Sequence, residues 1–471
     1  MPHQPPITGR QARTPDPAVP GPRRPWRALG RLALLMAALG GAGASQAYEY
    51  GPFTLHGFAK AEVGRYSNLC TGCQLLPNED RQRFWADQVV PGTPYGTQNT
   101  HVALLQPYLG AHFELPHGFK LSGLLSQRWR NGKVDLPGFW YEKNVSISHE
   151  DYGTLTIGAF PTRAWGFADY PFGSDFGGSD TWSSTGAGYG LNRHAIRYTS
   201  RLLDVNDGDL TLEATYDQGN TDFKVNKPRF IELWSRYYRG PLKLDVMLQD
   251  SRNGGPSSWG HAPFSGPMYT AAYDSKLGGA GQSIAMAMLR YQIDAHFELG
   301  AGLRRNRWSG AYAVCVDFVA GNCIWNNMFN TNWGGTDANG VPNPGYAATS
   351  TDFTLGLRYV TGPWSAYSSV VHLGRASTAN PVERGQSNSL TKLTLGGAYT
   401  VSDGLVLYGS LNAYAYGQAP QSSGCGTAPA SRAPGSCTLA PLSIPGNAVA
   451  GPDARISRSN NGITLGATYS F

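Results

Sequence analysis

Apolar and polar residues alternate with a period of two in many segments of about ten residues after residue 48. This period is that of a β-strand with one face in an apolar medium, and ten residues span a membrane when the strand is tilted. Segments of helical period extend no further than a few turns in this region. The pattern predicts sixteen strands: 53–66, 100–115, 119–130, 139–149, 153–160, 192–200, 208–217, 229–239, 241–251, 282–293, 296–308, 351–361, 363–375, 388–400, 404–416 and 461–471.

The connections between these segments alternate between short and long. The short ones are 116–118, 150–152, 201–207, 240, 294–295, 362 and 401–403. The long ones are 67–99, 131–138, 161–191, 218–228, 252–281, 309–350, 376–387 and 417–460. This asymmetry is typical of an outer-membrane barrel, which has short periplasmic turns and long external loops. The sequence therefore predicts an all-β fold, a transmembrane antiparallel β-barrel of sixteen strands.

Charged side chains fall on one side of the predicted strands, as lipid contact requires, because a charge at the lipid-facing midplane costs about 2–4 kcal/mol. In 119–130 the outward set is Phe119, Leu121, Gly123, Leu125, Gln127 and Trp129, and the inward set holds Lys120, Arg128 and Arg130. In 192–200, Ile196 and Tyr198 face outward while Arg193, Arg197 and Thr199 face inward. In 351–361 the outward residues are Phe353, Leu355, Leu357 and Tyr359, with Arg358 inside.

The composition agrees with a barrel. Charged residues make up 15% of the 471-residue chain, against about 25% in soluble domains. The mean hydropathy of −0.32 excludes a bundle of membrane-spanning helices. The formal net charge is +6, but it is concentrated at the N-terminus.

The first 47 residues have the features of a secretory signal peptide. Six arginines precede an apolar run, Leu32–Ala44, which is followed by the small-residue sequence Ser45-Gln46-Ala47. A membrane anchor is the alternative, but a run this short does not span a bilayer. We therefore expect a signal peptide at 1–47 and a barrel at 48–471. Residues 48–471 then hold 32 basic and 31 acidic residues, a net charge of +1, with no basic stripe for nucleic acid.

The last segment alternates Ile463, Leu465, Ala467, Tyr469 and Phe471 with small polar residues, and the chain ends at Phe471. This ending resembles the C-terminal sorting signal that the barrel-assembly machinery reads, with Tyr469 and Phe471 as its aromatic residues. An ordinary edge strand is the alternative reading.

Several segments together resemble the general porins of Gram-negative outer membranes, in particular the β-proteobacterial type. They are Gly153–Gly158, His194–Ser200, Leu395–Ser402 with Leu405–Tyr408, and the terminal Tyr469-Ser470-Phe471. Ala159 stands where the family usually has an arginine, and loops 252–281, 309–350 and 417–460 are long for the family. The resemblance implies a homotrimer with one pore in each subunit and an inward-folded third loop. It also implies passive diffusion of small hydrophilic solutes and ions, without a cofactor.

By this resemblance, loop 161–191 forms the pore constriction. It contributes three acids, Asp169, Asp175 and Asp180, and the inward positions of the wall supply Lys60, Arg128, Arg130 and Arg197. Acids on a loop that face bases on a wall would set a transverse field across the pore, and rings of charge set channel selectivity. The alternative is that these residues are solvated lumen charges with no role in a constriction.

The six cysteines lie two by two in three predicted external loops. The simplest pairing is Cys70 with Cys73, Cys315 with Cys323, and Cys425 with Cys437. A redox or metal site at Cys70 and Cys73 is the alternative, but neither a second Cys-x-x-Cys nor a neighbouring histidine supports it. We expect no metal site.

These patterns predict a passive outer-membrane channel. A substrate-specific channel is the second hypothesis, and a barrel enzyme or adhesin is the third, although the sequence shows no hydrolase, zinc-protease or phosphate-loop motif. The expected partners are outer-membrane lipid and lipopolysaccharide, two further copies of the chain, the assembly machinery and small hydrophilic solutes.

Overall fold

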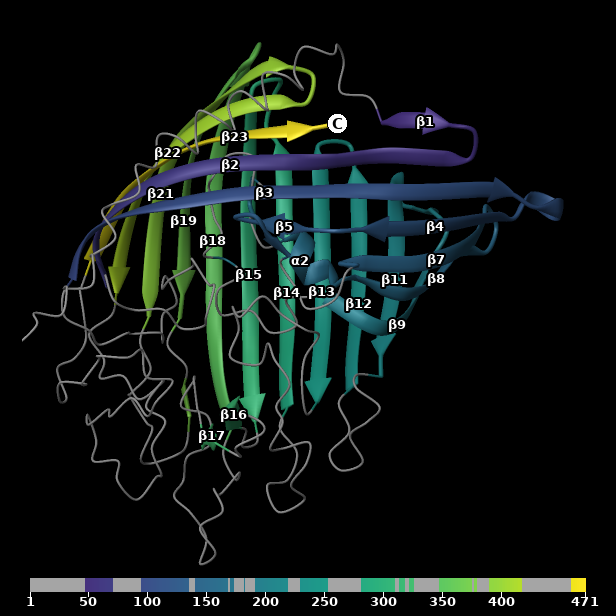
Figure 1. The fold of residues 1–471 in the computed structure, drawn as a ribbon, viewed down its shortest axis with the longest axis horizontal. Coiled ribbons are helices and arrows are strands. Elements are labelled where there is room, and N and C mark those ends of the chain that lie inside the picture. Colours follow the sequence, from purple (N-terminus) through teal and green to yellow (C-terminus); the bar gives the residue numbers. More distant parts are fainter. Residues whose placement is uncertain are drawn as a thin grey trace, which may run out of the picture. The chain divides into compact units, whose positions relative to one another are not determined.

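The computed structural model describes residues 47–70, 95–134, 140–167, 170–172, 182, 191–218, 229–252, 281–309, 313–317, 322–325, 347–374, 377–378, 389–416 and 459–471. Within these ranges, sixteen antiparallel strands close into one barrel (Figure 1). In order around the barrel they are β2 (Phe53–Cys70), β3 (Tyr95–Glu114), β4 (Lys120–Ser126), β7 (Glu142–His149), β8 (Gly153–Pro161), β9 (Leu191–Thr199), β11 (Gly208–Asp217), β12 (Arg229–Arg239), β13 (Leu242–Arg252), β14 (Gly281–Gln292), β15 (Phe297–Ser309), β18 (Ala347–Thr361), β19 (Trp364–Leu373), β21 (Leu390–Ser402), β22 (Leu405–Tyr416) and β23 (Ser459–Ser470).

Short elements accompany these strands. The short strands that pair with the barrel are β1 (Tyr48–Tyr50), β5 (Trp129–Arg130), β6 (Lys133–Val134), β10 (Leu203–Val205) and β20 (Ser377–Thr378). A separate hairpin consists of β16 (Ala313–Asp317) and β17 (Asn322–Trp325). The helical turns are η1 (Pro116–Gly118) and α2 (Arg163–Gly166). No helix in the described ranges has the length and hydropathy needed to cross a membrane.

The barrel closes between its first and last long strands. β23 pairs with β2 from Phe58↔Ser470 to Tyr66↔Gly462. The terminal residue continues the pairing, because the Phe471 amide donates to the carbonyl of Gly57 at 2.9 Å and its carbonyl accepts the Gly57 amide at 2.7 Å. Every barrel strand therefore has a hydrogen-bonded neighbour on both sides, as a lipid environment requires.

Each of the sixteen strands lies on one predicted segment, so the prediction of a sixteen-stranded barrel is confirmed. The predicted segment 119–130 differs in detail, because β4 ends at Ser126 and pairing resumes only in β5. The expectation that Gln127 faces lipid is wrong, since this residue is 3% exposed and its amide oxygen accepts the backbone N–H of Arg128 at 2.8 Å.

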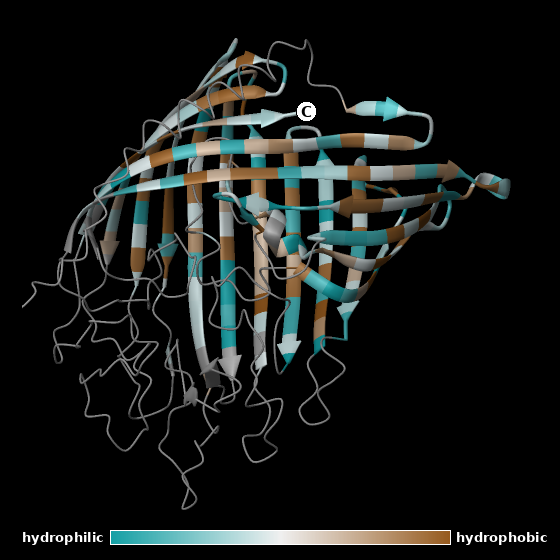
Figure 2. Cartoon of the chain, viewed as in Figure 1, coloured by the Kyte–Doolittle hydropathy of each residue, from teal (hydrophilic) through white to brown (hydrophobic). Residues whose placement is uncertain are grey.

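Alternation along the strands separates the two faces of the wall (Figure 2). On β18, Phe353, Leu355 and Leu357 are 40–47% exposed, whereas the intervening Asp352 and Thr354 are at most 2% exposed. Exposed apolar residues here face the membrane, and the polar residues face the lumen. The side-chain sorting predicted for this strand therefore holds.

Short turns join the strands at one end of the barrel. Gly240, Gly362 and Gly404 have φ values of +51°, +54° and +84° in three of these turns, a left-handed region that glycine enters without strain. At the turn after β14, the Asp294 carboxylate accepts the backbone N–H groups of His296 and Phe297, which lowers its pKa. The long connections leave the opposite end. The third of them, residues 162–190 between β8 and β9, is called loop 3 below.

We expect the cost of an outward charge to depend on its depth along one strand. Leu411→Arg, in the middle of β22 at an outward position that is 57% exposed, should lower the free energy of unfolding by about 2–4 kcal/mol. Ala415→Arg lies on the same face near the long-loop end and should cost about 0–1 kcal/mol. Denaturant titration in lipid vesicles measures both, and equal costs would contradict the assigned membrane face.

Candidate pore constriction

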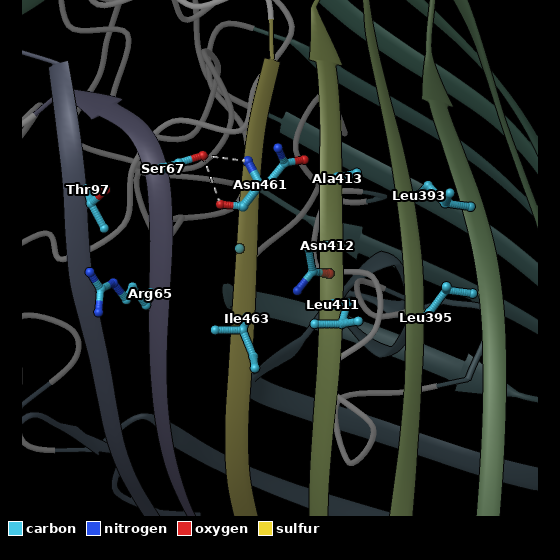
Figure 3. A pocket seen from close by; sticks show the side chains of 11 residues that line it. Arg65, Ser67, Thr97, Leu393, Leu395, Leu411, Asn412, Ala413, Asn461 and Ile463 are labelled. Carbon is cyan, nitrogen blue, oxygen red and sulfur yellow. Dashed lines mark hydrogen bonds between the residues drawn. The ribbon is translucent and has the colours of Figure 1, made fainter.

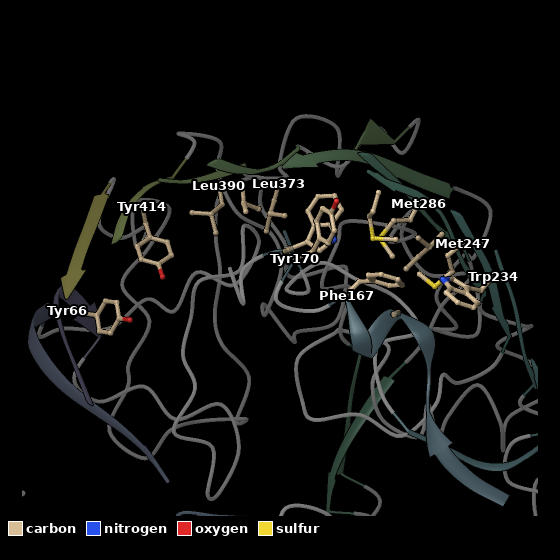
Figure 4. Packing of buried hydrophobic residues seen from close by; sticks show 14 residues of the cluster. Tyr66, Phe167, Tyr170, Trp234, Met247, Met286, Leu373, Leu390 and Tyr414 are labelled. Carbon is tan, nitrogen blue, oxygen red and sulfur yellow. The ribbon is translucent and has the colours of Figure 1, made fainter. Parts of the chain in front are cut away.

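Loop 3 enters the barrel. Three of its described aromatic residues, Phe167, Tyr170 and Trp182, are buried in one apolar cluster with inward-facing side chains of β13 and β14, among them Met247 and Met286 (Figure 4). These methionines project from the lumenal face of the wall. The prediction of an inward-folded third loop is therefore confirmed.

Two glycines on β15 and β18, the strands that follow β14 around the barrel, make room for the loop. A Cβ atom at Gly300 on β15 would lie 2.5 Å from the Cβ of Pro171. A Cβ atom at Gly356 on β18 would lie 2.7 Å from the ring of Phe172. Any side chain at either position would push this part of loop 3 away from the wall.

The sequence of β14 also indicates that loop 3 packs against this wall. The prediction of strands did not use this indication. On β14, Ile284, Met286 and Met288 are inward and buried, while Ala285 and Ala287 are outward and exposed. Over this stretch both faces of the strand are apolar, although the lumen of a barrel is normally polar. An apolar inner face indicates that part of the protein shields it from water. Loop 3 is that part.

Charged side chains tie the start of loop 3 to the wall. We call Arg163, Arg197, Glu213 and Glu232 the base cluster. Arg163 Nε lies 2.7 Å from Glu213 Oε1, and Arg197 Nε lies 3.0 Å from the same oxygen. Glu232 Oε1 accepts the backbone N–H of Arg163 at 2.8 Å and lies 3.7 Å from Arg197 Nη2. The cluster is formally neutral and connects loop 3 with β9, β11 and β12.

Arg163 remains charged in this setting. Burial acts to lower its pKa, but the hydrogen bond and charge of Glu213, together with the charges of Glu232 and Asp245, raise the pKa above its usual value. Its guanidinium also lies 4.9 Å from the centre of the Trp234 ring. The contact between Arg163 and Glu213 is therefore an ion pair.

Arg197, which the sequence places on the basic wall, lies at the base of loop 3. Its side chain is 9% exposed, and Nη2 donates to the carbonyl of Pro161, the residue just before the loop, at 2.9 Å. Its charge is matched by Glu213. Asp169, Asp175 and Asp180, the predicted loop acids, lie outside the described residues.

The other predicted wall residues lie on one part of the barrel, with Lys60 on β2, Arg130 on β5 and Arg128 in the link between β4 and β5. Lys60 pairs with Leu104, and Leu104 pairs with Arg130, so the Cα atoms of Lys60 and Arg130 are about 10 Å apart. Arg128 is 5% exposed and its guanidinium lies 5.5 Å from the ring centre of Tyr141.

Acids that the sequence prediction missed accompany these bases. Glu62 lies 3.1 Å from Lys60 Nζ and accepts the hydroxyl of Tyr408 at 2.7 Å. Glu142 is buried and accepts a hydrogen bond from Gln106 at 3.2 Å. This wall therefore carries acidic as well as basic described side chains, and Lys133 pairs with Arg130 in the register.

The far wall carries a second set of basic residues that sequence reasoning missed. Because β13 is the eighth strand from β2 in a barrel of sixteen, the two strands lie on opposite sides of the lumen. The ion pairs there are Arg236 with Asp245 at 2.6 Å, Arg304 with Asp352 at 2.8 Å, Arg290 with Glu298 at 2.5 Å, and Arg358 with Glu298. Three of the four join residues directly opposite each other in the strand register, so only the register reveals them.

Aromatic side chains of loop 3 lie over these arginines. The ring–guanidinium pairs are Phe167 with Arg236 at 6.0 Å, Phe172 with Arg358 at 5.9 Å, and Trp182 with Arg304 at 4.6 Å. Each of these arginines also has a carboxylate partner, although the four arginines of this wall share three carboxylates. The described part of loop 3 thus packs on a wall whose arginines are ion-paired, and this wall lies across the lumen from β2.

A groove of about 640 Å³ lies on the outer wall, at the long-loop end of β2 and β21–β23 (Figure 3). Its floor consists of outward-facing residues that are 44–57% exposed, namely Leu393, Leu395, Leu411 and Ile463. Arg65 and Ser67 line its edge. The groove faces the membrane, so it is no part of the solute path. Among the described residues, no group of three or more histidine, cysteine or acidic side chains is arranged to hold a metal.

The sequence matches one family of known proteins. The sequence profile described as "Gram-negative porin" matches residues 32–419. No curated protein sequence matches the chain.

Solved structures of outer-membrane proteins share the fold. The anion-selective porin from Comamonas acidovorans has a TM-score of 0.53 at 13% identity, over 89% of this chain and 99% of that one. The outer membrane channel DcaP of Acinetobacter baumannii has a TM-score of 0.53 at 11% identity, over 90% and 99%. OmpT of Vibrio cholerae, in its trimer form, has a TM-score of 0.52 at 12% identity, over 89% and 99%.

We expect loss of a carboxylate in the base cluster to release loop 3. Glu213→Gln leaves Arg163 and Arg197 without their shared partner and should lower the free energy of unfolding by about 3–5 kcal/mol, because it breaks a buried ion pair. Denaturant unfolding and protease cleavage within loop 3 measure the effect. Glu114→Gln removes an exposed pair with Lys120 and should cost less than about 1 kcal/mol. Equal effects of the two variants would show that the base cluster does not hold the loop.

Proposed function

The chain belongs to the Gram-negative porin family, and on that premise we propose that it is a passive diffusion channel for small hydrophilic solutes and ions. Porins of this family are channels of the outer membrane, and this chain is one of them. Its route for solutes is the lumen of the sixteen-stranded barrel. We propose that transport follows the concentration gradient and needs neither a catalytic residue nor a cofactor.

One observation carries the proposal. Loop 3 is held inside the barrel by the base cluster and by aromatic packing, so it narrows the lumen from one side. Its described underside packs on ion-paired arginines, and β2, which carries Lys60, lies across the lumen from β13. A narrow aqueous gap with charged walls admits hydrated polar solutes. It disfavours apolar solutes, because they displace water from the charged walls without forming polar interactions of their own.

We propose that Lys60, Arg128 and Arg130 form the basic side of the constriction and that the loop acids Asp169, Asp175 and Asp180 face them. Arg197 then has a positioning role, because its contacts in the base cluster fix the start of loop 3. Its charge does not act on solutes in the gap. A substrate-specific channel would show saturable block of conductance by one class of compound. A general channel would conduct in ohmic steps that no particular sugar or acid blocks.

The remaining proposals concern processing and assembly. We propose that residues 1–47 are a signal peptide and that three channels assemble as a homotrimer in contact with outer-membrane lipid and lipopolysaccharide. The trimeric form of the structurally similar Vibrio cholerae protein supports this stoichiometry. We also propose the disulfides Cys70–Cys73, Cys315–Cys323 and Cys425–Cys437. The β16–β17 register pairs residues 315 and 323 directly, which supports the second of them.

Reversal potentials in planar bilayers test the constriction. Arg128→Glu changes the local charge by two units and should raise the cation-to-anion permeability ratio by about threefold to tenfold, since unit charges a few ångströms from an ion interact by about 1 kcal/mol in water. Lys60→Gln should shift the ratio in the same direction by less. Arg65→Glu makes the same charge change on the outer wall and should leave the ratio unchanged. An unchanged ratio in both lumen variants would remove these residues from the constriction, and absence of any conductance by the wild-type protein would refute the channel.

The terminal aromatic residue should determine assembly. The ring of Phe471 lies 6.0 Å from that of Tyr469, and its backbone completes the seam with β2. Phe471→Ala should reduce the fraction of folded protein in the outer membrane and lower the free energy of unfolding by about 1–2 kcal/mol. The readout is the heat-sensitive mobility of the folded barrel in gels. Phe113→Ala, at an outward position away from the seam that is 45% exposed, is the control, and an equal loss there would argue against a terminal signal.

A further inference from the structure

A row of basic side chains crosses the inner wall near the short-turn end of β12, β13, β14 and β18, which is the upper end of these strands in Figure 1. We call it the basic row, and its members are Arg236, Lys243, Arg290 and Arg358. None of them belongs to the basic side proposed for the constriction, which consists of Lys60, Arg128 and Arg130.

The strand register places the members of the row side by side. Lys243 on β13 and Arg290 on β14 are direct partners. Arg236 on β12 lies opposite Asp245 of β13. Arg358 on β18 lies opposite Glu298 of β15. With strands about 4.8 Å apart, the row covers about 19 Å of the inner wall from β12 to β18.

Loop 3 contacts both ends of the row. The Phe167 ring lies 6.0 Å from the guanidinium of Arg236, and the Phe172 ring lies 5.9 Å from that of Arg358. Phe172 itself packs on Gly356, which is two residues further from the short turn than Arg358. The row therefore faces the lumen on the short-turn side of the loop, where a solute arrives after it has passed the loop.

The acids of this region are buried beneath the bases. The side chains of Asp245 and Glu298 are 2% and 9% exposed. Their partners Arg236, Arg290 and Arg358 are 28%, 27% and 21% exposed. The carboxylates thus fix the guanidinium groups from below, and the surface that water reaches in the lumen is positively charged.

The row carries more positive charge than these acids balance. Glu298 is shared, because Arg290 Nε lies 2.5 Å from its Oε1 and Arg358 contacts its Oε2. Asp245 pairs with Arg236 at 2.6 Å. The half-buried Lys243 adds a fourth positive charge. Four bases and two carboxylates leave a formal charge of +2.

Two further described acids lie near the row without joining it. Asp209 on β11 is opposite Tyr238 of β12, one strand beyond the row. The Asp294 carboxylate accepts the backbone N–H groups of its own turn. Neither has an ion pair with the row among the described contacts, so both leave its excess charge in place.

We propose that the basic row binds the carboxylate or phosphate group of small anionic solutes, a site that rests on the proposed function of the chain as a channel. Guanidinium groups bind both kinds of oxyanion through paired hydrogen bonds, and the ammonium of Lys243 adds a point charge. The ring of Tyr238 is 40% exposed and its centre lies 5.5 Å from Lys243 Nζ, so it can contact the apolar part of a solute.

An acidic protein is a poorer occupant of the row. The arginines point into the lumen beneath loop 3 and are less than 30% exposed, so the surface of a folded domain would not reach them. A small oxyanion needs only a few donor groups and fits this recess.

Lysine acylation of the refolded full-length barrel tests the site. A neutral acylating ester labels accessible lysines, and mass spectrometry reports the rate at each position. Sodium phosphate and sodium acetate are the probes, and sodium chloride at equal ionic strength is the reference. We expect phosphate and acetate to slow the labelling of Lys243 by about threefold or more. Labelling of Lys120, an exposed lysine at the same end of the barrel that pairs with Glu114, should not change.

Charge variants of opposite sign separate anion binding from a structural role. Arg290→Gln leaves Glu298 paired with Arg358 and should raise the phosphate concentration for half-protection of Lys243 about fivefold, because one positive charge is lost. Glu298→Gln adds one net positive charge and should lower that concentration by a similar factor. Lys120→Gln makes the same charge change as Arg290→Gln on another part of the barrel and should have no effect.

Several outcomes would overturn the site. They are equal protection by chloride, equal protection of Lys120, an unchanged half-protection concentration in Arg290→Gln, or shifts of the same sign in Arg290→Gln and Glu298→Gln. Heat-sensitive gel mobility verifies that each variant is folded, and Arg290→Gln alone decides if Glu298→Gln does not fold. Labelling requires no conduction. Protection of Lys243 without conductance would therefore refute the channel alone, and conductance without protection would refute the site alone.

Discussion

The fold depends on the need to pair every backbone N–H and C=O group inside an apolar medium. A sheet in lipid has no tolerable edge, so the first and last long strands must meet, and they do so along a seam that extends to Phe471. Closure then fixes the orientation of every side chain. One face of each strand contacts lipid and the other contacts the lumen, and strand order decides which residues lie across the lumen from one another. The seat of loop 3 in the lumen follows from this geometry.

Within the lumen, packing and electrostatics work together. Loop 3 packs against a wall of the lumen and loses contact with water there. The wall beneath it is therefore apolar at Met286 and Met288, and it has no side chain in the way at Gly300 and Gly356. The charged side chains of this wall form ion pairs with one another within the sheet. In the base cluster, the carboxylates of the sheet also pair with Arg163 of the loop. Buried charges that were not compensated would cost several kcal/mol each. In the proposed constriction, Lys60, Arg128 and Arg130 lie on the other wall of the gap.

The sequence by itself determined the strands, their number and the face of nearly every residue, because a period of two and the exclusion of charge from lipid are local constraints. Gln127 departs from the pattern because β4 ends one residue earlier, at Ser126. The tertiary structure decided which charges meet. Arg197 and Glu232 lie 35 positions apart in the chain and become neighbours only through the order of β9, β11 and β12. Pairing across strands depends on register and closure, which are properties of the whole barrel, and so no local pattern showed that Arg197 belongs beneath loop 3.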